Sequence, residues 1–263
     1  MIRNNILQLK QKISRLFWST ISSEEKVEYF QKIIRDKEWD DIEKYIPRNS
    51  KFLDIGCGSG YNLIKAKKEL NCEVTGIDPH PGSHGVGRYN KGFKIKIKKG
   101  HSEFLPFNNE SFDVVFCSHV LEHVSDEHKS LNEISRVVKK DGIIIIGMPT
   151  AVMSIILLLS KYFFTTHINI LAFIKSVGKK NMFTFFLRIF IPNSHSYPRA
   201  KTVFYDLVMY RVKRWRKLIS STFKINYTIS NHLYPYPDYI QPFKIHKSIF
   251  GGSSVFFICQ KKD

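Results

Sequence analysis

A chain of 263 residues that is 43% hydrophobic and 24% charged can bury a substantial core, which excludes a disordered chain and fits one α/β domain with an insertion. The formal net charge of +18 is uneven: 24 Lys and Arg stand against 20 Asp and Glu up to Gly142, a net of +4, and 17 against 3 from Ile143 onward, a net of +14. This asymmetry is compatible with nucleic acid, anionic lipid or an acidic substrate as a partner, and also with a solvated, lysine-rich surface.

The four cysteines indicate a reducing compartment and no structural zinc site, because they are scattered without Cys-x-x-Cys spacing. The first residues lack an uninterrupted apolar run followed by a small-residue cleavage site, so no secretory signal is predicted. We therefore expect a cytoplasmic protein, with peripheral association at the inner face of the membrane left open.

Two helices are expected before the first strand. Residues 1–20 carry apolar side chains at helical spacing with basic residues between them, a pattern that suits a helix packed on the domain, covering a cleft or lying on a membrane. Ser22-Ser23-Glu24-Glu25 is typical of a helix start, so a second helix is predicted from about Glu24 to Tyr45, ended by Pro47.

The stretch from Phe52 to Gly60 is the most informative in the chain. An apolar run containing Asp54 is followed by Gly56, Gly58 and Gly60, which predicts a buried parallel strand, a tight turn and a helix. Such a turn allows a ligand to lie against backbone N–H groups where the helix begins. The Gly-x-Gly-x-x-Gly spacing of dinucleotide-binding enzymes is absent, and a carboxylate before the turn would repel a pyrophosphate but suit a positively charged ligand.

A second acid follows at the end of the next predicted strand, Glu73–Asp78. Asp78 lies 24 residues beyond Asp54, about where a βαβ unit places a carboxylate that binds ribose hydroxyls, although an Asp here could instead cap a turn. The following loop contains His80 and His84, but no acid or Cys stands at a matching spacing, so no metal site is predicted.

Further strands are predicted from alternation at 94–98 and from apolar runs at 114–117 and 143–147. An amphipathic helix is expected at Leu131–Val138, with Lys139-Lys140-Asp141-Gly142 as its stop.

Three motifs together resemble class I S-adenosylmethionine-dependent methyltransferases. "LDIGCGSG" at 53–60 resembles their motif I, residues 100–116 resemble their "gDaexLPFxdxsFDvV" signature, and "SHVLEHV" at 118–124 resembles their "sxvLeHv". The resemblance is continuous through residue 150 and is to the small-molecule type called methyltransferase type 11. It implies S-adenosylmethionine as the cofactor and an α/β, Rossmann-like, seven-stranded, mostly parallel sheet with helices on both faces.

The resemblance also implies which residues border the cofactor. In the family, the glycine turn and the acid before it form motif I, whose ligand carries an ammonium and a sulfonium. The acid after the second strand binds the ribose, the next loop holds the adenine, and the loop after the fourth strand borders the methionine part. In this sequence those positions are Asp54, Gly56, Cys57, Gly58, Gly60, Asp78, Pro79, His101, Ser102, Glu103, Ser118 and His119.

One departure concerns the adenine. His101 stands where the family usually has an acid that accepts from the exocyclic amine, so Ser102 or Glu103 is the alternative acceptor. An apolar contact from Phe104 or Leu105 to the adenine face is a further alternative.

Methyl transfer needs a base only when the acceptor is a hydroxyl or a protonated amine. His119 is the first candidate because of its place beside the methionine end and its near-neutral intrinsic pKa. His195 is a second candidate; each could instead position the acceptor. Glu122 and His123 are expected to hold the loop.

The chain leaves the family pattern at Ala151. Residues 151–174 contain one clear charge, Lys161, which with His167 interrupts the run of ~20 apolar residues that a membrane span needs. We therefore expect helices inserted after the fifth strand, serving as a substrate lid, a dimer face or a surface that meets anionic lipid. A helix at 205–218, a strand at 223–225 and a last antiparallel strand at 254–259 complete the fold. The expected division is N-terminal helices at 1–46, cofactor-binding core at 47–150, insertion at 151–202 and completion of the core at 203–263.

The sequence thus predicts transfer of a methyl group from S-adenosylmethionine to a small-molecule or lipid-linked acceptor, at oxygen. Nucleic-acid methylation is the alternative that the basic C-terminal part suggests, but the Asn/Asp-Pro-Pro-aromatic motif of base-amino methyltransferases is absent after the fourth strand. A non-catalytic, membrane-associated protein with the same fold is a third interpretation.

Overall fold

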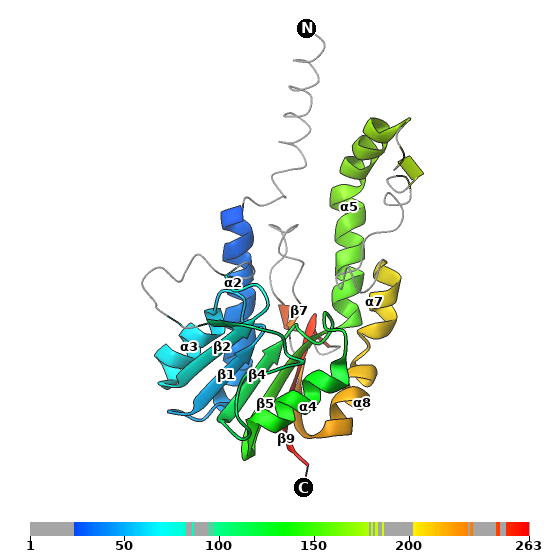
Figure 1. The fold of residues 1–263 in the computed structure, drawn as a ribbon. Coiled ribbons are helices and arrows are strands. Elements are labelled where there is room, and N and C mark those ends of the chain that lie inside the picture. Colours follow the sequence, from blue (N-terminus) through cyan, green and yellow to red (C-terminus); the bar gives the residue numbers. More distant parts are fainter. Residues whose placement is uncertain are drawn as a thin grey trace.

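Seven strands form one sheet in the order β3-β2-β1-β4-β5-β9-β6 (Figure 1). The computed structural model describes residues 24–82, 86, 95, 97–178, 180, 182–183, 186, 202–230, 232–233, 246–247 and 251–262. The helix predicted at 1–20 and His195 lie outside the described residues.

The sheet consists of β1 (Lys51–Ile55), β2 (Glu73–Asp78), β3 (Ile97–Lys99), β4 (Phe112–Ser118), β5 (Val138–Pro149), β6 (Phe223–Ile229) and β9 (Ser254–Lys261). The strands from β3 to β5 pair in parallel, and β9 pairs antiparallel with both β5 and β6. A separate pair is formed by β7 (His232–Leu233) and β8 (His246–Lys247). The predicted seven-stranded, mostly parallel sheet is confirmed.

Helices cover both faces of this sheet. The described helices are α2 (Glu24–Ile42), η1 (Glu43–Tyr45), α3 (Tyr61–Leu70), α4 (Glu127–Val137), α5 (Ala151–Ser176), α7 (Val203–Met209) and α8 (Val212–Thr222). One apolar cluster joins α4 and α8 to Leu53 and Ile55, and a second joins α2 and α3 to Phe52. Neighbouring residues of β1 thus serve opposite faces, as the period of two in a strand requires.

The predicted stop of α4 at Gly142 is wrong. The helix ends at Val137, and the extended backbone of Val138 begins β5 at once. Gly142 instead lies within β5, where an added Cβ would come within 2.5 Å of the Val138 side chain and 3.0 Å of the Asp113 carbonyl. A side chain at position 142 would therefore collide with its neighbours in the sheet, and glycine avoids this.

The single helix predicted at 205–218 is two helices, α7 and α8. Tyr210 leaves the helical conformation and Arg211 is extended. The break is stabilised because the side chain of Tyr210 is buried and its carbonyl accepts from the N–H of Ala151 at 3.0 Å. A tertiary contact thus overrides an uninterrupted helical pattern.

The expected helical insertion begins as α5, which leads away from the sheet beyond the end of β5 (Figure 1). Thr150 caps its first turn, and the Thr150 hydroxyl also donates to the carbonyl of Gly252 at 2.6 Å, which fixes the base of the helix to the start of β9. Among the described residues, no helix combines the length and the apolar character needed to cross a membrane.

Candidate cofactor site

The turn after β1 is built by three left-handed glycines. Gly56, Gly58 and Gly60 have φ values of 71°, 55° and 87°, a region that residues with a side chain rarely adopt. A Cβ at Gly56 would also lie 2.2 Å from Cγ2 of Val120, which comes from the loop after β4. The alternate glycines therefore permit both the shape of the turn and the close approach of a second loop.

Four backbone N–H groups of this turn are bonded within the protein. The N–H groups of Gly56 and Cys57 both donate to the carbonyl of Ile77, at 2.8 and 3.3 Å. Those of Gly58 and Gly60 donate to Asp78 Oδ2 and to the Cys57 carbonyl, each at 2.8 Å. These four donors are therefore bonded within the protein, and the N–H groups at the start of α3 stay the predicted donors to a ligand.

Asp54 is a buried acid at the end of the first strand. Its side chain is 2% exposed, and Oδ2 has no hydrogen-bond partner among the residues that the structure describes. Burial raises the pKa of this carboxyl well above its ordinary value; Arg35 opposes the effect and Asp78 adds to it. An orphaned oxygen of this kind is suited to a cationic or hydrogen-bond-donating ligand.

Asp78 occupies the end of β2 and is bonded to the turn. Besides accepting from Gly58, its carboxylate accepts from the N–H of His80 at 2.7 Å through Oδ1. Both roles considered for Asp78 are therefore compatible: it caps the turn, and each carboxylate oxygen has a second lone pair that a ribose hydroxyl could use. Pro79 follows directly and is half-buried.

The loop after β3 is held from within. The hydroxyls of Ser102 and Ser130 are hydrogen-bonded at 2.9 Å, and Glu103 Oε1 accepts from the N–H groups of Ser125 and Asp126, each at 3.0 Å. His101 is exposed. The two side chains considered as alternative adenine acceptors thus already have structural partners.

The Leu105-Pro106-Phe107 stretch is fixed to α4. The N–H of Leu105 donates to Glu133, and Arg136 donates to the carbonyls of Leu105 and Phe107, at 2.7 to 2.9 Å. Leu105 is buried, whereas Phe104 is 66% exposed with the Lys129 ammonium over its ring. Of these two apolar candidates for contact with the adenine, only Phe104 has an exposed side chain.

The end of β4 carries Ser118 and His119. Ser118 Oγ is buried with no hydrogen-bond partner among the described residues, and it adjoins Gly147, where a Cβ would approach it to 2.5 Å. His119 has a left-handed backbone with φ of 56°, and its N–H donates to the Gly147 carbonyl. The neighbouring strand β5 thus leaves room around both residues.

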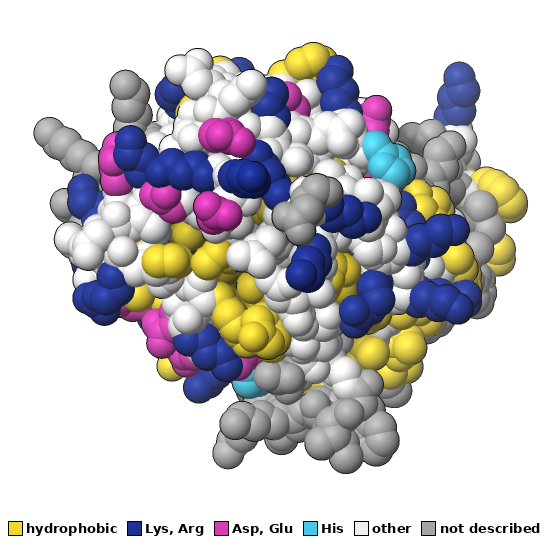
Figure 2. Space-filling view, turned by 90° about the horizontal axis from the view of Figure 1, so that it is seen from below, with side chains coloured by type: hydrophobic (Ala, Val, Ile, Leu, Met, Phe, Trp, Pro, Cys, Tyr) yellow, Lys and Arg dark blue, Asp and Glu magenta, His cyan; other side chains and the backbone are white. Residues whose placement is uncertain are grey.

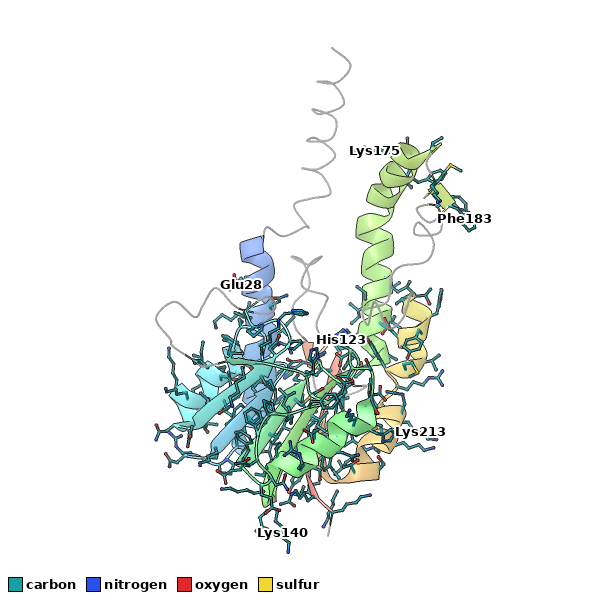
Figure 3. All side chains as sticks on the ribbon, in the orientation of Figure 1. Glu28, His123, Lys140, Lys175, Phe183 and Lys213 are labelled. Atoms are coloured by element: carbon teal, nitrogen blue, oxygen red, sulfur yellow. The ribbon has the colours of Figure 1, made fainter. Side chains whose placement is uncertain are left out.

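The His119 ring is surrounded by polar groups from three segments. Nε2 lies 3.1 Å from Ser254 Oγ and 3.8 Å from Glu38 Oε1, and Nδ1 lies 3.5 Å from Glu122 Oε1. Burial alone would lower the pKa of the imidazole, but the nearby carboxylates of Glu122 and Glu38 raise it above its ordinary value. His123 is largely exposed at the same edge of the sheet (Figure 3), and its Nε2 lies 3.8 Å from Glu122, in line with a loop-holding role for Glu122.

Glu38 and Ser254 were not identified from the sequence. Ser254 gives no signal, because it comes from the far end of the chain. Glu38 does leave a signal in the sequence, because it lies between Ile34 and Ile42 at a spacing of four residues and so interrupts an apolar stripe. A charge on the apolar face of a helix indicates a specific partner.

These residues meet at the carboxyl edge of β1, β2 and β4, where open α/β sheets bind ligands. The unpaired Asp54 oxygen and the left-handed glycine turn fit a nucleoside that carries positive charge. The described residues contain no cluster of His, Cys, Asp and Glu able to hold a metal ion.

Comparison with known proteins agrees with this arrangement. The family described as "Methyltransferase domain" matches residues 53–146, from the middle of β1 into β5. Over these residues the chain is similar to methyltransferase domains. The cofactor of such a domain is S-adenosylmethionine.

Relatives and structural neighbours share this domain. The chain is 29% identical over 109 residues to a ubiquinone/menaquinone biosynthesis C-methyltransferase of Campylobacter jejuni (39% of this chain, 46% of the relative), and 34% identical over 120 residues to a ubiquinone biosynthesis O-methyltransferase of Pelagibacter ubique (44% and 49%). The match therefore spans less than half of either relative. One solved structure with a similar fold is an S-adenosylmethionine-dependent methyltransferase of Thermotoga maritima, described as a possible histamine N-methyltransferase. It superposes with a TM-score of 0.50 and covers 89% of this chain and 98% of its own. At 17% sequence identity this likeness shows the fold alone.

Proposed function

We propose that this protein transfers a methyl group from S-adenosylmethionine to a small-molecule acceptor. The observation that carries the proposal is the unpaired, buried oxygen of Asp54 beside the left-handed glycine turn, within a matched methyltransferase domain. Asp54 and Ser118 are assigned to the methionine part, Asp78 to the ribose, and His101 and Phe104 to the adenine. The cofactor supplies the activated methyl group, so the protein chiefly has to align the acceptor and exclude water.

We infer further that the acceptor atom is oxygen. A hydroxyl must lose its proton as it is methylated, and His119, which we assign to the methionine end, has two nearby carboxylates that make its imidazole a stronger base. Only the neutral imidazole can accept a proton. Because the pKa of His119 is raised, the rate is expected to increase with pH until that raised pKa is passed.

An amphiphilic, lipid-linked acceptor is the finer form of this proposal. Two relatives carry names from ubiquinone biosynthesis, and α5 presents exposed apolar side chains toward its far end. Ile170 and Ile174 are exposed near the end of α5, and Val177 and Phe183 are exposed just after it. Lys175 and Lys180 are exposed in the same stretch, and Figure 3 shows Lys175 and Phe183 at this far end. Apolar and cationic side chains on one projecting element suit an anionic membrane surface.

The opposite end of the molecule does not favour nucleic acid. In Figure 2, Lys and Arg side chains are dispersed over the face seen from below, with acidic side chains among them over one half. This face contrasts with the continuous basic stripe that a backbone-binding protein uses.

Isothermal titration with S-adenosylmethionine tests the central proposal. The wild type is expected to bind, and Asp78→Ala is expected to weaken binding by about ten-fold to a hundred-fold, because a hydrogen bond to a charged group contributes ~1.5–3 kcal/mol. Asp141→Asn, an exposed acid at the opposite edge of the sheet, is the matched control. No binding by the wild type at millimolar ligand would refute the proposal.

Co-sedimentation with vesicles tests the membrane surface. Binding to vesicles with anionic lipid is expected, and reversing Lys175 and Lys180 to Glu should abolish it. The same reversal of Lys213 and Lys217, exposed on α8, is the control. If the α5 reversal leaves binding unchanged, or if anionic vesicles do not bind the wild type, this part of the proposal is wrong.

A further inference from the structure

Glu38 is a charged side chain buried on a helix outside the matched methyltransferase domain. It is 5% exposed and lies in the same stripe of α2 as Ile34 and Ile42. Burying a carboxylate costs several kcal/mol unless charged or hydrogen-bonding partners compensate. Arg35 Nη1 lies 2.5 Å from Oε2 of Glu38, and His119 Nε2 lies 3.8 Å from Oε1. One oxygen of Glu38 is therefore directed to the helix's own arginine and the other to the site.

His119 receives partners from several elements. Glu122, itself 2% exposed, approaches Nδ1, and Ser254 of β9 approaches Nε2. The left-handed backbone of His119 costs on the order of 1 kcal/mol in a residue with a side chain. Such strain persists where surrounding contacts hold the residue, and these polar contacts supply that constraint.

We propose that Glu38 is a positioning residue: it orients the His119 imidazole toward the acceptor and strengthens it as a base. The inference rests on the proposed O-methylation. In that reaction the acceptor oxygen gains the methyl group, the sulfonium becomes a thioether, and the hydroxyl proton passes to the imidazole. Glu38 and Glu122 then flank the resulting imidazolium.

Several other charged groups face the His119 ring or its carboxylate partners. Arg35 of α2 opposes protonation of the ring and also acts on Asp54 of β1, and His123 adjoins Glu122. Substituting Glu38 alone leaves all of these in place. A change in the His119 titration on that substitution therefore reports the Glu38 charge.

Nuclear magnetic resonance titration of the histidine ring nitrogens tests the proposal in the full chain without cofactor or acceptor. The His119 signals are assigned by their loss in His119→Gln. In Glu38→Gln we expect the pKa of His119 to shift downward, because a neutral amide replaces the carboxylate. Asp40→Asn, exposed on the same helix, should leave it unchanged.

A second variant keeps the test decisive if Glu38→Gln does not fold. Arg35→Gln removes the cation that competes with His119 for Glu38, so the pKa of His119 should shift upward. A His119 pKa that is unchanged in Glu38→Gln, or unchanged or lowered in Arg35→Gln, overturns the proposal. Because the titration needs no methyl transfer, and calorimetry with S-adenosylmethionine on the same samples tests cofactor binding, failure of either proposal is recognised separately.

Discussion

At the scale of single residues, Asp54 combines a cost to folding with its proposed role in cofactor binding. Its pKa is raised by burial, so the folded state holds a proton at this carboxyl more readily than the unfolded chain does. Between the ordinary value of 3.8 and the raised value, ionisation therefore lowers the stability as pH rises, and the full loss is present above the raised pKa.

We predict that Asp54→Asn stabilises the protein at neutral pH and weakens cofactor binding. The amide is close in shape and stays neutral, so the free energy of unfolding should rise by about 1–3 kcal/mol, the usual cost of an unsatisfied buried polar group. The gain should shrink as pH is lowered toward 3.8. Urea unfolding across this pH range measures the first effect and calorimetry the second; a variant that is less stable at neutral pH and binds normally would contradict both.

At the scale of elements, α2 is attached to the domain by polar contacts at several points. Asp36 accepts from Tyr61 at 2.5 Å and from Lys65 at 3.1 Å, both on α3. Trp39 donates to Glu69 at 2.7 Å. This attachment carries Glu38 into the site, so the position of a helix outside the matched domain bears on the chemistry inside it.

We predict that Asp36→Asn loosens α2 without unfolding the sheet. Burial raises the pKa of Asp36. Hydrogen bonds from Lys32, Tyr61 and Lys65 lower the pKa by more than burial raises it, so the net shift is downward. The stabilisation is therefore present above pH 3.8 and is lost as pH falls through the lowered pKa. At pH 7 the variant should lose ~1 kcal/mol, and amides of α2 should exchange faster with deuterium than those of β4.

The matched control for this prediction is Asp40→Asn. Asp40 is exposed and only loosely paired with Lys37, at 3.9 Å, so exchange in α2 should not change. Equal acceleration in both variants would mean that Asp36 does not anchor the helix.

Sequence patterns predicted helices and strands well where residues close together in the chain determine the local structure. The glycines after β1 and the acids at the ends of β1 and β2 were found because parallel strands bring their carboxyl ends together. The break at Tyr210 and the placement of Gly142 in β5 were missed because contacts with Ala151 and Asp113, distant in the chain, decide them. Ser254 was missed for the same reason, whereas Glu38 could have been noticed as a charge on the apolar face of α2, although its partner His119 is far from it in the chain.

At the scale of the whole molecule, residues 53–146 supply only part of the sheet, because β6 and β9 come from later in the chain. Val255 and Phe257 of β9 and Trp215 of α8 belong to the same apolar cluster as β1, β4 and β5. The domain that the family match covers therefore depends on residues from beyond the insertion.

We predict that a chain truncated after Thr150 does not fold cooperatively. It lacks the β9 strand that pairs with β5 from Ile144 to Pro149, and the apolar side chains beneath α8 become exposed. Thermal unfolding followed by circular dichroism should show no sharp transition, and a hydrophobic dye should bind; the full chain, which should unfold sharply, is the control. A cooperative transition in the truncated chain would show that the first five strands are sufficient.

The position of β9 also dictates an order of assembly on the ribosome. β6 is synthesised before β9 yet has no place in the sheet until β9 lies between it and β5. The edge of β5 thus stays open while the insertion, α7, α8 and β6 emerge, and late, long-range closure of this kind is slow and exposed to aggregation. The nascent chain should therefore need a chaperone most between the synthesis of β5 and the synthesis of β9.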